Sequence, residues 1–109
     1  MKQISLYTDW IFHEDNPYAE PLYVDTEKRV LRFTLRPGQQ IREHLAPHSP
    51  VHIVILQGQG VFTGEDEIEY QVGQGHLLIF DSGEKHSIRA LDTELVFVAF
   101  LHGIPQFRG

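Results

Sequence analysis

The stretch GHLLIFDSGEKHSIRA, residues 75–90, gives the first indication of the fold. It holds two short runs, HLLIF at 76–80 and HSIRA at 86–90, separated by the polar segment DSGEK, which contains Gly83. Runs of this length, bounded by Gly, Asp and Ser, are typical of β-strands joined by a tight turn. The stretch therefore predicts two strands and the turn between them.

The same signal recurs upstream in VLRFTLR, residues 30–36. Here Leu31, Phe33 and Leu35 alternate with polar residues, the period-two pattern of a half-buried strand. A Pro-Gly pair that ends in Gly38 then closes the run. We expect this strand to turn one face to a core.

Further strand signals are spread along the rest of the chain. They lie at 51–56, in a hairpin that turns near 64–66, at 95–101 and, in an otherwise irregular N-terminal segment, at 4–7 and 22–24. No window of ordinary helix length keeps apolar residues at i, i+3, i+4 and i+7 without an internal Gly or Pro. The pattern predicts an all-β fold, a small jelly-roll barrel whose lumen can hold a ligand.

Composition limits the class of protein. We expect one domain, residues 1–109, since the chain has no linker, repeat or low-complexity tract. The net charge of −6, from 15 acidic and 9 basic residues without a Lys/Arg block, argues against nucleic acid or an anionic membrane as partner. The absence of cysteine and of a signal-peptide pattern favours a cytoplasmic location.

Three histidines lie at intervals of four in REHLAPHSPVHIVI, residues 42–55: His44, His48 and His52. Two prolines in the segment exclude a helix, so the spacing does not place them on one helical face. We expect a strand through His44, a turn over 46–50 and a returning strand through His52. In an antiparallel pair, His44 and His52 would then lie side by side, close enough to share one ion.

Residues 75–90 resemble the second sequence signature of the cupin superfamily, whose small single-domain members have an RmlC-like jelly roll. Gly75, Gly83 and His86 match that signature in register. Asp81 stands where the family has proline, and Ala90 where it has asparagine. The turn and the histidine of the signature are thus kept.

The first cupin signature is matched less completely. Gly38 and His44 match its start, and Gly58 matches its end. The resemblance implies a second histidine and a glutamate as metal ligands between them, but Ala46 and Val51 stand at those positions. Two of the four usual ligand positions are therefore lost.

The resemblance implies a divalent metal on His44 and His86, with His48 and His52 as candidate replacements for the missing ligands. If the strand register follows the family, Val51 faces the lumen and His52 points away from it. His52 would then contribute only if the preceding turn shifted the returning strand by one residue.

Two classes of function are open for a chain that resembles cupins over residues 30–100. The first is a metalloprotein that carries Zn, Fe, Ni, Cu or Mn on imidazoles and acts as a small-molecule enzyme of dioxygenase or isomerase type. The second is a metal-free module that binds or senses a small ligand in the lumen. A scaffold with a filled lumen is a third alternative. The metalloprotein is favoured slightly, because His48 and His52 add imidazoles beside the retained positions.

The remaining notable residues have structural interpretations. We expect His13, His76 and His102 to be ordinary surface or edge histidines, and the acidic cluster at 65–69 to be a solvated hairpin tip. Five phenylalanines are expected in the core: Phe33, Phe62, Phe80, Phe97 and Phe100.

A homodimer is expected as the assembly. Small single-domain cupins are usually paired, and the N-terminal strands and the apolar final strand are expected to offer sheet edges that a monomer would leave exposed.

Overall fold

The computed structural model describes residues 1–45 and 49–102, with the backbone alone at 43–45. Within these residues the chain forms nine β-strands and no helix. The strands are β1 Tyr18–Val24, β2 Lys28–Leu35, β3 Gln40–Leu45, β4 Val51–Gln57, β5 Gln59–Thr63, β6 Glu69–Gly73, β7 Leu77–Phe80, β8 Lys85–Ala90 and β9 Leu95–His102. No helix capable of crossing a membrane occurs in this part of the chain. The predicted all-β fold is confirmed.

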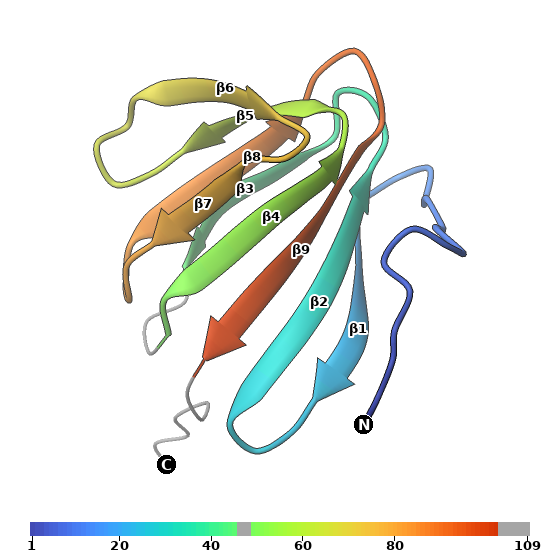
Figure 1. The fold of residues 1–109 in the computed structure, drawn as a ribbon. Coiled ribbons are helices and arrows are strands. Elements are labelled where there is room, and N and C mark those ends of the chain that lie inside the picture. Colours follow the sequence, from blue (N-terminus) through green and yellow to red (C-terminus); the bar gives the residue numbers. More distant parts are fainter. Residues whose placement is uncertain (46–48, 103–109) are drawn as a thin grey trace.

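The strands form two antiparallel sheets that face each other (Figure 1). One sheet has the order β1-β2-β9-β4-β7, and the other has the order β3-β8-β5-β6. Consecutive strands β3 and β4 belong to different sheets, so the connection between them crosses from one layer to the other. This arrangement is the expected jelly roll. The final strand β9 is central in its sheet, so the prediction that it forms an edge is wrong.

The core fills the space between the sheets. In β2, Leu31, Phe33 and Leu35 all contribute to it, as the alternation predicted. The buried members of this interior cluster are Leu35, Val51, Ile53, Ile55, Phe62, Phe80, Ile88, Ala90, Leu95, Phe97, Ala99 and Leu101. Of the predicted core phenylalanines, Phe100 instead packs with a second cluster, on the outer face of the five-stranded sheet.

The N-terminal segment, residues 1–17, lies outside the two sheets and covers part of that outer face (Figure 1). Leu6, Trp10 and Phe12 pack there against a cluster formed by Leu56, Val96 and Val98. The predicted strand at 4–7 is wrong, because this segment is attached by side chains rather than by strand pairing. The buried Arg32 guanidinium donates to the carbonyls of Ser5 and Leu6 and to the carboxylate of Glu20.

The turn between β1 and β2 is organised by Asp25. Its carboxylate accepts hydrogen bonds from the amides of Glu27 (2.7 Å) and Lys28 (2.8 Å) and from the Tyr23 hydroxyl (2.9 Å). The Glu27 amide first, then the Tyr23 hydroxyl and the Lys28 amide, hold the pKa of Asp25 below its ordinary value of 3.8. The same hydroxyl bond raises the pKa of Tyr23.

We expect Asp25→Asn to change the acid sensitivity of the fold. Because the pKa of Asp25 is lowered by folding, its ionised form stabilises the native state above the ordinary pKa, and this stabilisation is lost as pH falls through the lowered value. The Tm of the variant should therefore lie below that of the wild type near pH 6, and the gap should narrow at about pH 3. An equal gap at both pH values in thermal melts would contradict this role for Asp25.

Candidate functional site

His86 is a buried polar residue at one end of the interior. In β8 it alternates with outward residues, and it shares the inward face with Ile88 and Ala90. Only 4% of His86 is exposed. Its ring stacks on that of Phe80 at a centroid distance of 4.6 Å. His86, which the cupin resemblance identified after the Gly83 turn, thus has its imidazole inside the barrel.

The backbone contact of the His86 ring indicates which tautomer the neutral ring adopts. Nδ1 lies 3.2 Å from the carbonyl oxygen of Glu84. A carbonyl oxygen only accepts, so Nδ1 donates its proton, and the neutral ring carries its lone pair on Nε2. Metal-binding histidines are commonly oriented in this way, with the other ring nitrogen donating to a carbonyl.

Glu84 also fixes the turn that precedes His86. Its carboxylate accepts from the amides of Asp81 (2.9 Å) and Glu65 (3.0 Å). Glu65 in turn accepts from the amide of Lys85 at 2.8 Å. These bonds join the β7–β8 turn to the β5–β6 hairpin, so the acidic hairpin tip also has a structural role. The role of Glu84 could not be predicted from the sequence, because its partner Glu65 lies 19 residues away along the chain.

His44 is the cross-strand neighbour of His86. The backbone register of β3 against β8 pairs Ile41 with Ile88 and His44 with His86, and the interval contains one more residue on β3. Such a bulge is a common way to redirect a strand at the rim of a barrel. The two histidines that match the cupin signatures are therefore paired residues of adjacent strands.

The predicted pairing of His44 with His52 is wrong. The strands on both sides of the turn form as expected, but β3 pairs with β8, whereas β4 pairs with β9 and β7. The chain crosses between sheets at this point, so the two histidines lie on strands of opposite layers.

His52 lies on the outer face of β4. Val51 and Ile53, on either side of it, belong to the interior core. The ring of His52 instead contacts that of His102, with centroids 5.2 Å apart. The strand has not shifted by a residue, so the structure does not bring His52 together with His86. The predicted set of four ligands therefore does not converge as a whole.

The sheet that faces His86 presents an apolar row. Val51 pairs with Phe80 on one side and with Leu101 on the other, and all three side chains are buried in the interior. Val51 stands where the resemblance implied a glutamate, so this wall offers no carboxylate ligand. Beside it, the buried Ser49 hydroxyl accepts from the amide of His102 and donates to the carbonyl of Pro50.

The other histidines occupy separate places. His48 lies outside the described residues, and His13 stacks on Tyr18 near the surface. Among the residues that the structure describes in full, no three His, Cys, Asp or Glu side chains gather as a metal site. The side chains of His44 and His48 are not part of that set.

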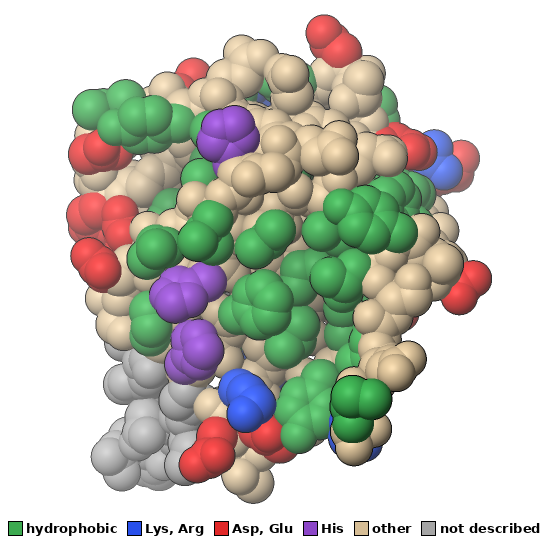
Figure 2. Space-filling view, viewed as in Figure 1, with side chains coloured by type: hydrophobic (Ala, Val, Ile, Leu, Met, Phe, Trp, Pro, Cys, Tyr) green, Lys and Arg blue, Asp and Glu red, His purple; other side chains and the backbone are tan. Residues whose placement is uncertain are grey.

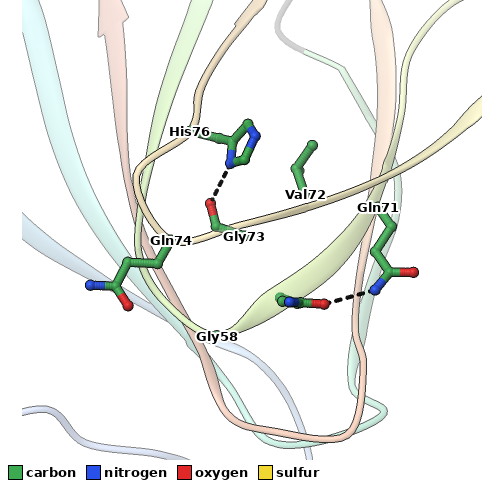
Figure 3. Close-up of a pocket in the computed structure, with 7 residues that line it drawn as sticks. Gly58, Gln71, Val72, Gly73, Gln74 and His76 are labelled. Carbon is green, nitrogen blue, oxygen red and sulfur yellow. Dashed lines mark hydrogen bonds between the residues drawn. The ribbon is translucent and has the colours of Figure 1, made fainter.

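An open pocket lies beside the turns that join β4 to β5 and β6 to β7 (Figure 3). It has a volume of about 490 Å³ and is lined by Gly58, Gln59, Gln71, Val72, Gly73, Gln74 and His76. The Gln71 amide donates to Gln59, and the His76 ring bonds to the carbonyl of Gly73. Among the described residues, those that line the pocket include no Asp, Glu, Lys or Arg.

These features define a class: a small jelly-roll barrel with an apolar interior and a buried histidine at one end. The sequence model of the cupin domain matches residues 31–101, more than half of the chain. The protein therefore belongs to the cupin family, as the resemblance predicted. No curated protein matched the chain in sequence.

Solved structures show the same fold. A protein from Thermus thermophilus superposes with a TM-score of 0.89 at 18% identity, covering 96% of this chain and 100% of the other. An RmlC-like cupin from Desulfovibrio desulfuricans gives a TM-score of 0.81 at 24% identity, covering 93% and 96%. A protein of Thermotoga maritima described as a predicted oxalate decarboxylase gives 0.65 at 28% identity, covering 72% and 69%.

Proposed function

We propose that this cupin binds one divalent transition metal ion at the His86 end of its barrel, with His44 and His86 as ligands and His48 as a third. The observation that carries the proposal is the β3–β8 register, which makes His44 and His86 direct neighbours. Directly opposed residues of an antiparallel pair have Cβ atoms about 4.5–5.5 Å apart, a spacing that suits two ligands of one ion. His52 is left out of the set because it lies on the outer face.

The donor set fits a particular group of metals. Neutral imidazoles without a thiolate suit Zn, Fe, Ni, Cu or Mn better than Ca or Mg. The Nδ1 bond of His86 to the Glu84 carbonyl supports this role, since it orients the ring as in many metal-binding histidines, with Nε2 as the ligand atom. A bound ion of this kind would supply Lewis acidity or an oxygen-binding centre for a small-molecule reaction of dioxygenase or isomerase type.

A metal-free ligand-binding module is the second candidate. The buried Val51 favours it, because an apolar side chain occupies the place of a family carboxylate ligand. Together with Phe80 and Leu101 it forms a wall suited to the apolar part of a small molecule. The two candidates differ in whether the purified protein binds a metal.

Elemental analysis of untagged protein and a titration with Zn²⁺ test the proposal. We expect about one ion per chain, with affinity that falls below about pH 6.5 because the ligands must be neutral imidazoles. His44→Ala and His86→Ala should each weaken binding by about 100-fold or more. The controls His13→Ala and His52→Ala should bind as the wild type does.

Thermal melts of each variant separate a lost ligand from a damaged fold, because His86 is buried and its removal also affects packing. A wild-type protein without a titratable site would rule out the metal proposal and leave the metal-free module. Weakened binding in His52→Ala would contradict the assigned ligand set.

A further inference from the structure

Two turns at one edge of the molecule are bonded to each other through glutamate side chains. Glu65 lies in the β5–β6 turn, and Glu84 lies in the β7–β8 turn, just before β8 begins. The Glu84 carboxylate accepts from the Glu65 amide at 3.0 Å, and the Glu65 carboxylate accepts from the Lys85 amide at 2.8 Å. Figure 2 shows acidic side chains gathered along the edge where Figure 1 places both turns. We call Glu65 and Glu84 the glutamate pair.

The glutamate pair fixes the main chain around Glu84. The second carboxylate oxygen of Glu84 accepts from the Asp81 amide at 2.9 Å, so the same side chain closes its own turn and reaches the neighbouring one. The bond from the Lys85 amide to Glu65 holds the residue that follows Glu84. Hydrogen bonds from amides to an ionised carboxylate are stronger than those between neutral groups. The peptide groups on both sides of Glu84 therefore have defined positions.

Gly64 leaves the space that this contact needs. A Cβ at residue 64 would lie 2.7 Å from a carboxylate oxygen of Glu84 and 3.6 Å from the ring of Phe80. The ring of Phe80 is the one on which His86 stacks, at a centroid distance of 4.6 Å. The β5–β6 turn therefore lies against two residues that contact the His86 ring, although it belongs to another hairpin.

We propose that Glu84 is a positioning residue for His86 and that Glu65 supports it from the neighbouring turn. The main-chain carbonyl of Glu84 lies 3.2 Å from Nδ1 of His86 and accepts its proton. In the other neutral tautomer, two lone pairs would face each other across this distance. Because the glutamate pair fixes the carbonyl, it also fixes the tautomer and the orientation of the ring. The consequence for metal affinity rests on the proposed function, whereas the consequence for the tautomer needs no metal.

Heteronuclear NMR of the imidazole nitrogens in metal-free protein tests the proposal, since the signals of Nδ1 and Nε2 differ between the two neutral tautomers. At about pH 8, where an ordinary imidazole is neutral, the wild type should show His86 with its proton on Nδ1. Glu84→Ala and Glu65→Ala should each give a mixture of tautomers. Glu84→Gln keeps one acceptor oxygen and should lie between Glu84→Ala and the wild type.

The control variant is Glu69→Ala, which removes the same charge from an exposed position of the β5–β6 hairpin outside the glutamate pair. Its His86 signals should match those of the wild type. In a Zn²⁺ titration, Glu84→Ala should bind about 10-fold more weakly than the wild type, as is typical when a group that orients a ligand is removed. Far-UV spectra of all variants should be native, because Glu65 and Glu69 are exposed and Glu84 lies in a turn.

An unchanged His86 tautomer in both Glu84→Ala and Glu65→Ala would overturn the proposal. An equal change in Glu69→Ala would also overturn it, since the lost charge rather than the contacts would then be the cause. Zn²⁺ affinity that is the same in Glu84→Ala as in the wild type would reject the positioning role and leave the proposed metal function in place. A wild type that binds no Zn²⁺ would end the metal proposal, and the tautomer measurement would still decide the role of Glu84.

Discussion

Replacing Gly58 by alanine is expected to lower the free energy of unfolding by about 3–5 kcal/mol. Gly58 links β4 to β5 with a φ of +83°, a conformation that side chains disfavour. A Cβ at this position would also overlap the main-chain oxygen of Glu94. The backbone on one side must therefore move, which disturbs the start of the buried strand β9. Urea unfolding of the variant measures this cost.

Gly38→Ala is the matched control for this prediction. Gly38 has nearly the same φ, +82°, but nothing lies within 4 Å of the Cβ it would gain. The Gly38→Ala variant should therefore lose only the free energy needed to hold an alanine at a positive φ, about 1–2 kcal/mol. If both variants lost the same free energy of unfolding, the overlap with the Glu94 oxygen would not contribute to the effect of Gly58→Ala. Both glycines matched the first cupin signature, and only one of them is required by close packing.

Phe97→Ala is also expected to lower the free energy of unfolding, by about 3–5 kcal/mol, as is typical when a buried phenylalanine is replaced by alanine. Phe97 is 1% exposed in the central strand β9. Its ring stacks on Phe33 of the neighbouring strand at 4.9 Å and meets Phe62 of the opposite sheet edge-on at 5.8 Å. Alanine would remove the contacts that join the two sheets and leave a cavity between them.

The same unfolding experiment with Ile68→Ala supplies the control, since Ile68 is exposed on the β5–β6 hairpin. Its effect should stay within about 0.5 kcal/mol. A Phe97→Ala variant that is as stable as Ile68→Ala would mean that the core refills the space, contrary to the rigid packing expected between two sheets.

Most strands could be predicted from the sequence because their signals are local. The alternation in β2, the turns near 64–66 and 81–84, and the glycine before His86 each depend on residues within one strand or turn. The N-terminal segment was harder, because the apolar residues at 4–7 fit a strand equally well. Whether such a run pairs or packs depends on side-chain contacts, such as those of Arg32 with Ser5 and Leu6, that are distant in sequence.

The face of His52 could not be decided by periodicity alone. The run VHIVIL is apolar on both sides, because β4 has the interior core on one face and the outer cluster on the other. Period-two alternation identifies a buried face only when the opposite face is polar. The register implied by the cupin resemblance correctly predicted that Val51 faces the interior and that His52 therefore points away from it.

The sequence by itself determined the all-β class, the cupin family and the histidine that follows the Gly83 turn, since these depend on patterns carried by short segments. Only the tertiary structure decided that His44 neighbours His86 rather than His52, and that β7 leaves Leu77 and Ile79 uncovered. Alternation fixes which side chains share a face of one strand, but it does not specify which strands pair. That choice depends on how the chain crosses between the two sheets after β3, through contacts between residues far apart in sequence.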